Sequence, residues 1–140
     1  MSRVFWDSNL FVYLLEDRGQ LGERVASLRE RMRERGDRLF TSALTLGEIL
    51  VKPMQAGSHA LVARYEQTLP RAATILPFSA EAAPHFARIR AARSVRPPDA
   101  IQLACAAAAE IDLFITNDDR LSRVVVPGIH FISSLERAFL

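Results

Sequence analysis

Hydrophobic and polar positions alternate along the chain between two kinds of segment. Short apolar runs predict strands over residues 3–6, 39–41, 74–76, 112–116 and 129–132. Longer stretches with apolar residues at helical spacing predict helices over 10–15, 21–35, 44–54, 58–69, 81–93 and 97–110, with shorter helical turns after residue 119 and over 135–140. Short strands that alternate with helices are typical of a parallel sheet covered on both faces, so the predicted fold class is α/β.

Capping and helix-breaking residues set the limits of these elements. Asp7-Ser8-Asn9 supplies capping side chains before the first helix, and Gly36-Asp37 ends the second. Pro53 is expected to kink or close the third helix, and Pro70 to follow the end of the fourth. The pair Pro97-Pro98 suits the opening turn of the alanine-rich helix.

The size and composition of the chain limit its class. With 140 residues, 49% apolar and 24% charged types and no internal repeat, residues 1–140 are expected to form a single domain. The longest apolar runs, such as 103–109, are far shorter than a membrane span, and no signal-peptide stretch fits before Asp7. Cys105 is the only cysteine, which excludes an internal disulfide, so a cytoplasmic location is expected.

The basic residues are almost all arginines, although the net charge is small. Arginine outnumbers lysine 17 to 1, while the net charge is only +2. A guanidinium grips phosphate with two hydrogen bonds, so the excess of arginine suits nucleic acid or acidic peptides. The composition of the genome would explain the same excess, and the charge alone does not separate these interpretations.

Four acidic residues stand where such a sheet gathers its ligands, beyond the carboxyl ends of the strands. Asp7 ends the first predicted strand, and Asp118 follows the fourth. Glu48 lies one turn into the helix after the second strand, and Asp99 lies in the first turn of the alanine-rich helix. If the first strand is central, with the second and fourth on either side, the four carboxylates converge.

Each acid also has a purely structural explanation. Asp7 and Asp118 suit helix caps or turns, Asp99 suits the positive end of its helix, and Glu48 is spaced to pair with Lys52. Helical spacing nevertheless puts Glu48 and Asp99 on partly apolar faces. Carboxylates are seldom placed there without a cationic partner, which favours a shared site.

A cluster of four ionised carboxylates requires protons or cations, and two divalent ions would cancel its charge. Oxygen ligands without nearby histidine or cysteine suit Mg²⁺ or Mn²⁺ rather than Zn²⁺. His59, His85 and His130 stand alone in the sequence and are expected at the surface rather than as ligands. Carboxylate-held metal ions are the usual arrangement for phosphodiester hydrolysis.

Four segments, in order along nearly the whole chain, resemble the motifs of PIN-domain ribonucleases, most closely the VapC-type toxins of prokaryotic toxin–antitoxin pairs. They are Val4-Phe5-Trp6-Asp7-Ser8-Asn9, Thr41-Ser42 with Thr45-Leu46-Gly47-Glu48-Ile49, Pro98-Asp99-Ala100-Ile101-Gln102-Leu103-Ala104, and Phe114-Ile115-Thr116-Asn117-Asp118. The departures are Ser8, where threonine is frequent, and Pro53 soon after Glu48.

This resemblance implies a three-layer α/β/α sandwich with a short-stranded parallel central sheet, and Mg²⁺- or Mn²⁺-dependent endonucleolytic cleavage of single-stranded or structured RNA. It assigns the catalytic metal site to Asp7, Glu48, Asp99 and Asp118. Asn9 and Thr116 become supporting polar residues, and Asp119 an adjacent acid with a less defined role. It also implies a homodimer and a cognate antitoxin encoded nearby.

Residues 82–98 contain no acid and carry four arginines just before Asp99. Arg93 and Arg96 are therefore the preferred candidates for RNA binding, with a solvated helix face as the alternative. In residues 21–38 arginine is interleaved with glutamate, which favours the solvated face there.

Other functions remain open. A non-catalytic RNA- or protein-binding module would use the same fold, and a DNA-cutting nuclease the same acids. A phosphoacceptor receiver domain also gathers acids at strand ends, but it needs a lysine near the last strand, and the only lysine is Lys52.

Overall fold

The computed structural model describes residues 1–16 and 19–138. Five parallel strands form one sheet in the order β3-β2-β1-β4-β5. The strands are β1 (Arg3–Trp6), β2 (Arg38–Ser42), β3 (Thr74–Leu76), β4 (Leu113–Thr116) and β5 (Phe131–Ser134). The first strand is central, with β2 and β4 on either side, which is the arrangement that the convergence of the four acids requires.

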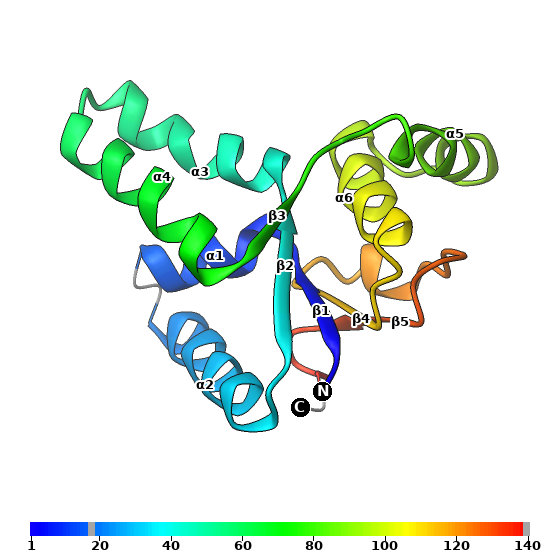
Figure 1. Cartoon of the computed structure of the whole chain (residues 1–140), viewed down its shortest axis with the longest axis horizontal. Coiled ribbons are helices and arrows are strands. Elements are labelled where there is room, and N and C mark those ends of the chain that lie inside the picture. Colours follow the sequence, from blue (N-terminus) through cyan, green and yellow to red (C-terminus); the bar gives the residue numbers. More distant parts are fainter. Residues whose placement is uncertain (17–18, 139–140) are drawn as a thin grey trace.

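Helices cover both faces of the sheet and complete a three-layer α/β/α sandwich, as expected (Figure 1). One face carries α1 (Ser8–Leu15), α2 (Gln20–Arg35), α3 (Ala43–Gln55) and α4 (His59–Ala72). The other carries α5 (Ala82–Ala92), α6 (Pro97–Ala108) and the 3₁₀ turn η1 (Leu121–Arg123). No helix in the described part of the chain is long and apolar enough to span a bilayer.

The central strand β1 contributes side chains to the hydrophobic core on both faces of the sheet. Val4 and Trp6 pack with the helices α1 to α4, whereas Phe5 packs with α5 and α6, and all three side chains are fully buried. This follows from the two-residue period of a strand, which sends alternate side chains to opposite faces. Phe5 also stacks on Phe114 of β4, with ring centroids 4.8 Å apart.

The alanine-rich helix α6 is almost wholly buried because small side chains let neighbouring backbone approach it closely. Gly128, in the loop before β5, has a φ of 100° and lies against Ala107. A Cβ atom at position 128 would come within 2.9 Å of the Ala107 carbonyl oxygen, so only glycine fits there. This packing fixes α6, and with it the position of Asp99.

Two helices run through prolines that were expected to limit them. Pro53 does not close α3, which continues to Gln55, and Pro70 lies inside α4, which continues to Ala72 instead of ending at Leu69. Both prolines lie in or next to the last turn. A missing N–H there leaves only one carbonyl without its helical partner, both where the proline is buried, as Pro53 is, and where it is exposed, as Pro70 is.

The C-terminal part of the chain also differs from the sequence prediction. The last strand spans Phe131–Ser134 rather than 129–132, because the ladder with β4 continues through two serines, while Ile129 is buried from the preceding turn. The helix α6 ends at Ala108, two residues early, and Glu110 adopts a positive φ of 53°. Residues 135–137 form a turn instead of a helix, and residues 139–140 lie outside the described part.

Candidate active site

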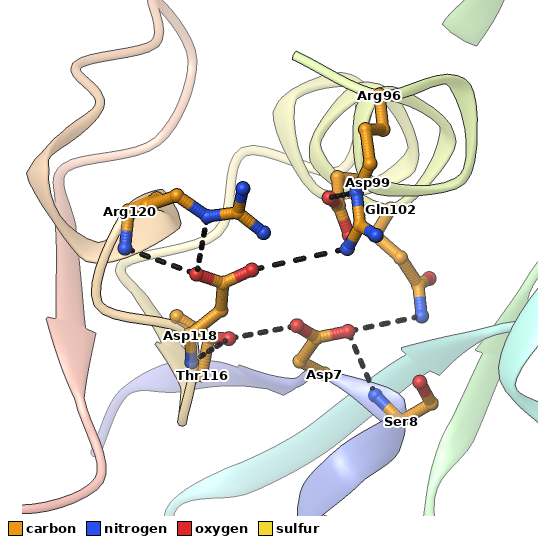
Figure 2. A network of polar contacts seen from close by, with 8 residues as sticks. All are labelled: Asp7, Ser8, Arg96, Asp99, Gln102, Thr116, Asp118 and Arg120. Atoms are coloured by element: carbon orange, nitrogen blue, oxygen red, sulfur yellow. Dashed lines mark hydrogen bonds and ion pairs between the residues drawn. The ribbon is translucent and has the colours of Figure 1, made fainter.

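Asp7 joins the central strand to the first helix and is 6% exposed. Its Oδ1 accepts a 2.8 Å hydrogen bond from the Ser8 backbone N–H, which caps α1. Its Oδ2 accepts a 2.7 Å hydrogen bond from the hydroxyl of Thr116, at the end of β4 (Figure 2). Asp7 is therefore a helix cap, as its structural explanation predicts, and also the buried centre of a polar cluster.

Asp118 is tied to the same point through Thr116. The Asp118 backbone N–H donates a 3.1 Å hydrogen bond to the Thr116 hydroxyl oxygen. The Asp118 carboxylate accepts a 3.0 Å hydrogen bond from the Arg120 backbone N–H, as a turn-forming aspartate does. One threonine hydroxyl thus links Asp7 to the turn that carries Asp118.

Asp99 faces Asp118 across a bridging arginine. The Nε atom of Arg96 lies 3.2 Å from Asp99 Oδ2, and its Nη2 lies 4.0 Å from Asp118 Oδ2 (Figure 2). Arg120 adds a second cation, with Nε 3.6 Å from Asp118 Oδ1. The structure therefore brings Asp7, Asp99 and Asp118 into one contact network, with two guanidinium groups at its solvent side.

Glu48 lies further out than the sequence suggested. It is exposed on α3, and the apolar face expected around it is open, because Val51 is 50% exposed. The ion pair between Glu48 and Lys52 that the spacing allowed is not the one formed, since Lys52 pairs with Glu16, at 3.3 Å. Glu48 is nevertheless close enough for its charge to raise the pKa of Asp7.

The pKa of Asp7 is raised from 3.8 to about 6, mainly because burial removes water from the carboxylate. The negative charges of Asp99 and Glu48 raise it further. Hydrogen bonds from Thr116 and Ser8 oppose the shift by stabilising the ionised form. A nearby cation would therefore stabilise the ionised form of this buried carboxylate.

A buried side-chain amide contacts Asp7 and was not predicted as a site residue from the sequence. Gln102 is 1% exposed; its Nε2 lies 2.8 Å from Thr45 Oγ1 and 3.5 Å from Asp7 Oδ1, and its Oε1 accepts a hydrogen bond from Ser42. A hydrogen bond of 2.8 Å joins Thr45 to Thr41. The available signal was a lone amide within the apolar run of α6.

Three further candidate residues occupy different surroundings. The Oδ1 atom of Asn9 is buried without a hydrogen-bond partner among the described residues, two positions after Asp7. Asp119 is exposed, and only its main-chain oxygen has a described contact, with the Ser122 hydroxyl at 2.8 Å. Arg93 donates a 2.6 Å hydrogen bond from Nη2 to the Val125 carbonyl oxygen.

The donor chemistry of this cluster suits a hard divalent cation. Its groups are carboxylates, and the raised Asp7 pKa calls for a positive partner; the buried Asn9 oxygen, two positions after Asp7, also lacks a donor. Within residues 1–16 and 19–138, no three acidic, histidine or cysteine side chains are already arranged as a ligand group. Arg96 accounts for this at Asp99 and Asp118, because its guanidinium lies between them.

Comparison with known proteins identifies the family of the chain. A sequence profile described as the PIN domain matches residues 4–127. No curated protein matches the chain.

Several solved structures share the fold at low sequence identity. VapBC2 from Rickettsia felis, bound to a DNA fragment from its promoter, superposes with a TM-score of 0.74 at 14% identity, over 94% of this chain and 97% of that one. A toxin–antitoxin complex from Klebsiella pneumoniae gives 0.68 at 20% identity, over 90% and 94%. DNA-bound VapBC from Salmonella typhimurium gives 0.66 at 21% identity, over 96% and 99%.

Proposed function

The chain belongs to the PIN domain family, and on this basis we propose that it is a metal-dependent endoribonuclease, the VapC-type toxin of a toxin–antitoxin pair. The observation that carries the proposal is the contact network in which Asp7, Asp99 and Asp118 meet around Thr116 and Arg96. Asp7 is buried there with a pKa of about 6. Buried carboxylates of this kind mark functional sites.

In this proposal Asp7, Asp99 and Asp118 hold Mg²⁺ or Mn²⁺, with Glu48 at the outer edge. A bound ion of this type would lower the pKa of a water molecule so that it loses a proton and can attack phosphorus, and would stabilise charge on the phosphate oxygens. Thr116 orients Asp7, because its hydroxyl fixes one carboxylate oxygen, and Asn9 offers its unpaired amide oxygen. Asp119 lies outside the contact network and is assigned no direct part.

Arg96 has two successive roles, one before and one after a divalent cation binds. Without a divalent cation it neutralises Asp99 and Asp118, and 67% of its side chain stays exposed. When a divalent cation takes its place, the guanidinium becomes free to bind an RNA phosphate. Arg93, three residues earlier, is the second candidate for phosphate binding.

An antitoxin segment with apolar side chains is the proposed partner. A cavity of about 320 Å³ between α1, α3 and α4 is lined mainly by apolar residues, among them Val12, Ile49 and Leu61. Glu48 lies on its wall, so the cavity adjoins the acidic cluster. A partner seated there would extend toward the carboxylates, and the neighbouring reading frame is the first place to look for it.

We further propose that residues 1–140 act as one nuclease domain, that the chain works as a homodimer and that it resides in the cytoplasm. Matches that span 90% and 96% of this chain support the first proposal.

A non-catalytic RNA-binding module is the alternative, favoured by one observation. Arg96 already satisfies Asp99 and Asp118, so the acids are stable without a metal. A receiver domain is disfavoured, since Lys52 lies on α3 and pairs with Glu16.

RNA cleavage with Mg²⁺ or Mn²⁺ separates these possibilities. The wild type is expected to cut a mixed-sequence RNA, while Asp7→Asn and Asp99→Asn lose the metal-dependent activity and Asp119→Asn keeps it. Full activity in both site variants would refute the assignment. RNA binding without cleavage, unchanged in Asp7→Asn, would establish the binding module instead.

A further inference from the structure

A second hollow lies beside the acidic cluster and has no part in the metal site. It is a cavity of about 430 Å³ between α5 and residues 125–127. Its wall on α5 includes His85, Arg88 and Ile89, and its opposite wall includes Val125 and Pro127. We refer to it as the α5 cavity.

The two walls carry complementary chemistry. Val125 and Pro127 offer exposed apolar surface, with Val125 73% exposed, and Ile89 lies behind it at 5% exposed. Arg88 is exposed, and its described contact is with His85, where Nη2 lies 3.3 Å from Nδ1. No acid occurs in residues 82–98, so the charge on this wall is positive only.

The α5 cavity adjoins the acidic cluster. A smaller hollow of about 80 Å³ beside the carboxylates is lined by Ser94, Asp99, Asp118 and Val124, among others. The α5 cavity begins at the next residues on both walls, at 93 and 125. The hydrogen bond from Arg93 to the Val125 carbonyl oxygen holds the walls together at that junction.

We propose that the α5 cavity binds one nucleotide of the RNA next to the cleaved bond. The base packs on Val125 and Pro127, and the phosphate pairs with Arg88. An apolar surface beside a guanidinium is what a stacked base and its phosphate require. This inference rests on the proposed nuclease function and adds a subsite to it.

Positive charge without acids and a position next to the carboxylates favour a nucleotide over other occupants. A peptide or a second copy of the chain would have to bring both an apolar side chain for the apolar wall and a carboxylate for Arg88. These occupants are therefore distinguished by whether Arg88 contributes to RNA binding.

Binding of a fluorescent ten-nucleotide RNA to the whole chain, measured by anisotropy in chelator, tests the subsite. Arg88→Gln removes the phosphate contact, and Val125→Glu places a negative charge at the mouth while keeping the main-chain oxygen that Arg93 bonds. Arg31→Gln is the matched control, since α2 lies on the opposite face of the sheet (Figure 1).

Both cavity variants are expected to bind about ten-fold more weakly than the wild type, Arg88→Gln because it loses one charged hydrogen bond and Val125→Glu because its carboxylate repels the phosphates. Arg88→Gln should also reduce the slope of log affinity against log salt by about 0.7, the value for one phosphate of a single strand. Arg31→Gln should change the affinity less than two-fold.

Affinities within two-fold of the wild type in both cavity variants would overturn the subsite. So would a change in oligomeric state in Val125→Glu with RNA affinity unchanged, because it would make the cavity a contact between copies. Failure of the nuclease proposal looks different: the wild type itself would not cut this RNA when Mn²⁺ is added, whatever the affinities.

Discussion

The hydroxyl of Thr116 donates a 2.7 Å hydrogen bond to Oδ2 of Asp7, and so ties the ends of two adjacent parallel strands. The same oxygen accepts a hydrogen bond from the Asp118 backbone N–H. Thr116 therefore sets the ionisation of one acid and the position of another.

Thr116→Val is expected to raise the pKa of Asp7 above about 6, because the bond that it removes lowers that pKa. Loss of the hydrogen bond should also lower the free energy of unfolding by about 1–2 kcal/mol. The carboxyl ¹³C shift of Asp7 followed against pH measures the first effect, and Thr116→Ser should restore the wild-type value. An unchanged titration in Thr116→Val would show that the bond is not formed in solution.

Asp7 makes stability depend on pH. The pKa is about 6 in the folded chain and near 3.8 when unfolded, so the folded state binds the proton more tightly. Its contribution is full below pH 3.8 and is lost as the pH rises through 6, a change of roughly 3 kcal/mol. Asp7→Asn stays neutral and should therefore be more stable than the wild type at pH 8 without metal, with the difference vanishing near pH 4.

Urea unfolding at both pH values measures this effect. Asp119→Asn is the matched control, since it removes an exposed carboxylate outside the contact network. A wild type more stable than Asp7→Asn at pH 8 in chelator would contradict the raised pKa.

Gln102→Leu should cost about 2–3 kcal/mol of stability, because the hydroxyls of Ser42 and Thr45 lose a buried partner. Gln67→Leu, an exposed change on α4, should stay within about 0.5 kcal/mol of the wild type. Thermal and urea unfolding give both values. Equal effects in the two variants would mean that the buried network does not stabilise the fold.

Arg96→Gln is expected to bind Mn²⁺ up to about five-fold more tightly, because the cation that competes for Asp99 and Asp118 is gone. RNA affinity should fall at the same time. Titration calorimetry with Mn²⁺ measures the first effect. Arg123→Gln, on the neighbouring turn η1, controls for net charge and should show neither change. Weaker Mn²⁺ binding in Arg96→Gln would contradict the competition.

Local patterns in the sequence were enough to predict the sheet and the main site elements. Residues 4–9 combine a buried run with a capping aspartate, so both β1 and the start of α1 could be predicted. Pro70 misled the prediction of the end of α4, because a proline in the last turn removes only one helical hydrogen bond, whereas the helix predicted past Pro53 ends within one residue of α3. The last strand was misplaced since Ile129 is buried without being paired.

The features of the site that could not be predicted from the sequence depend on tertiary contacts. Four acids in the right order predict convergence, but the exposure of Glu48 depends on how α3 packs. The pairing of Arg96 with Asp118 joins residues from separate elements. The role of Gln102 depends on partners in β2 and α3, far away in the chain.

The melting temperature with and without millimolar Mn²⁺ tests most directly whether these carboxylates form one cation site. Binding to the folded state alone should raise the wild-type melting temperature by about 5 °C at roughly thirty times the dissociation constant. Asp119→Asn should show the same rise, and Asp7→Asn and Asp99→Asn should show little or none. No rise in the wild type at a Mn²⁺ concentration that supports RNA cleavage, or an equal rise in all four proteins, would contradict a shared site.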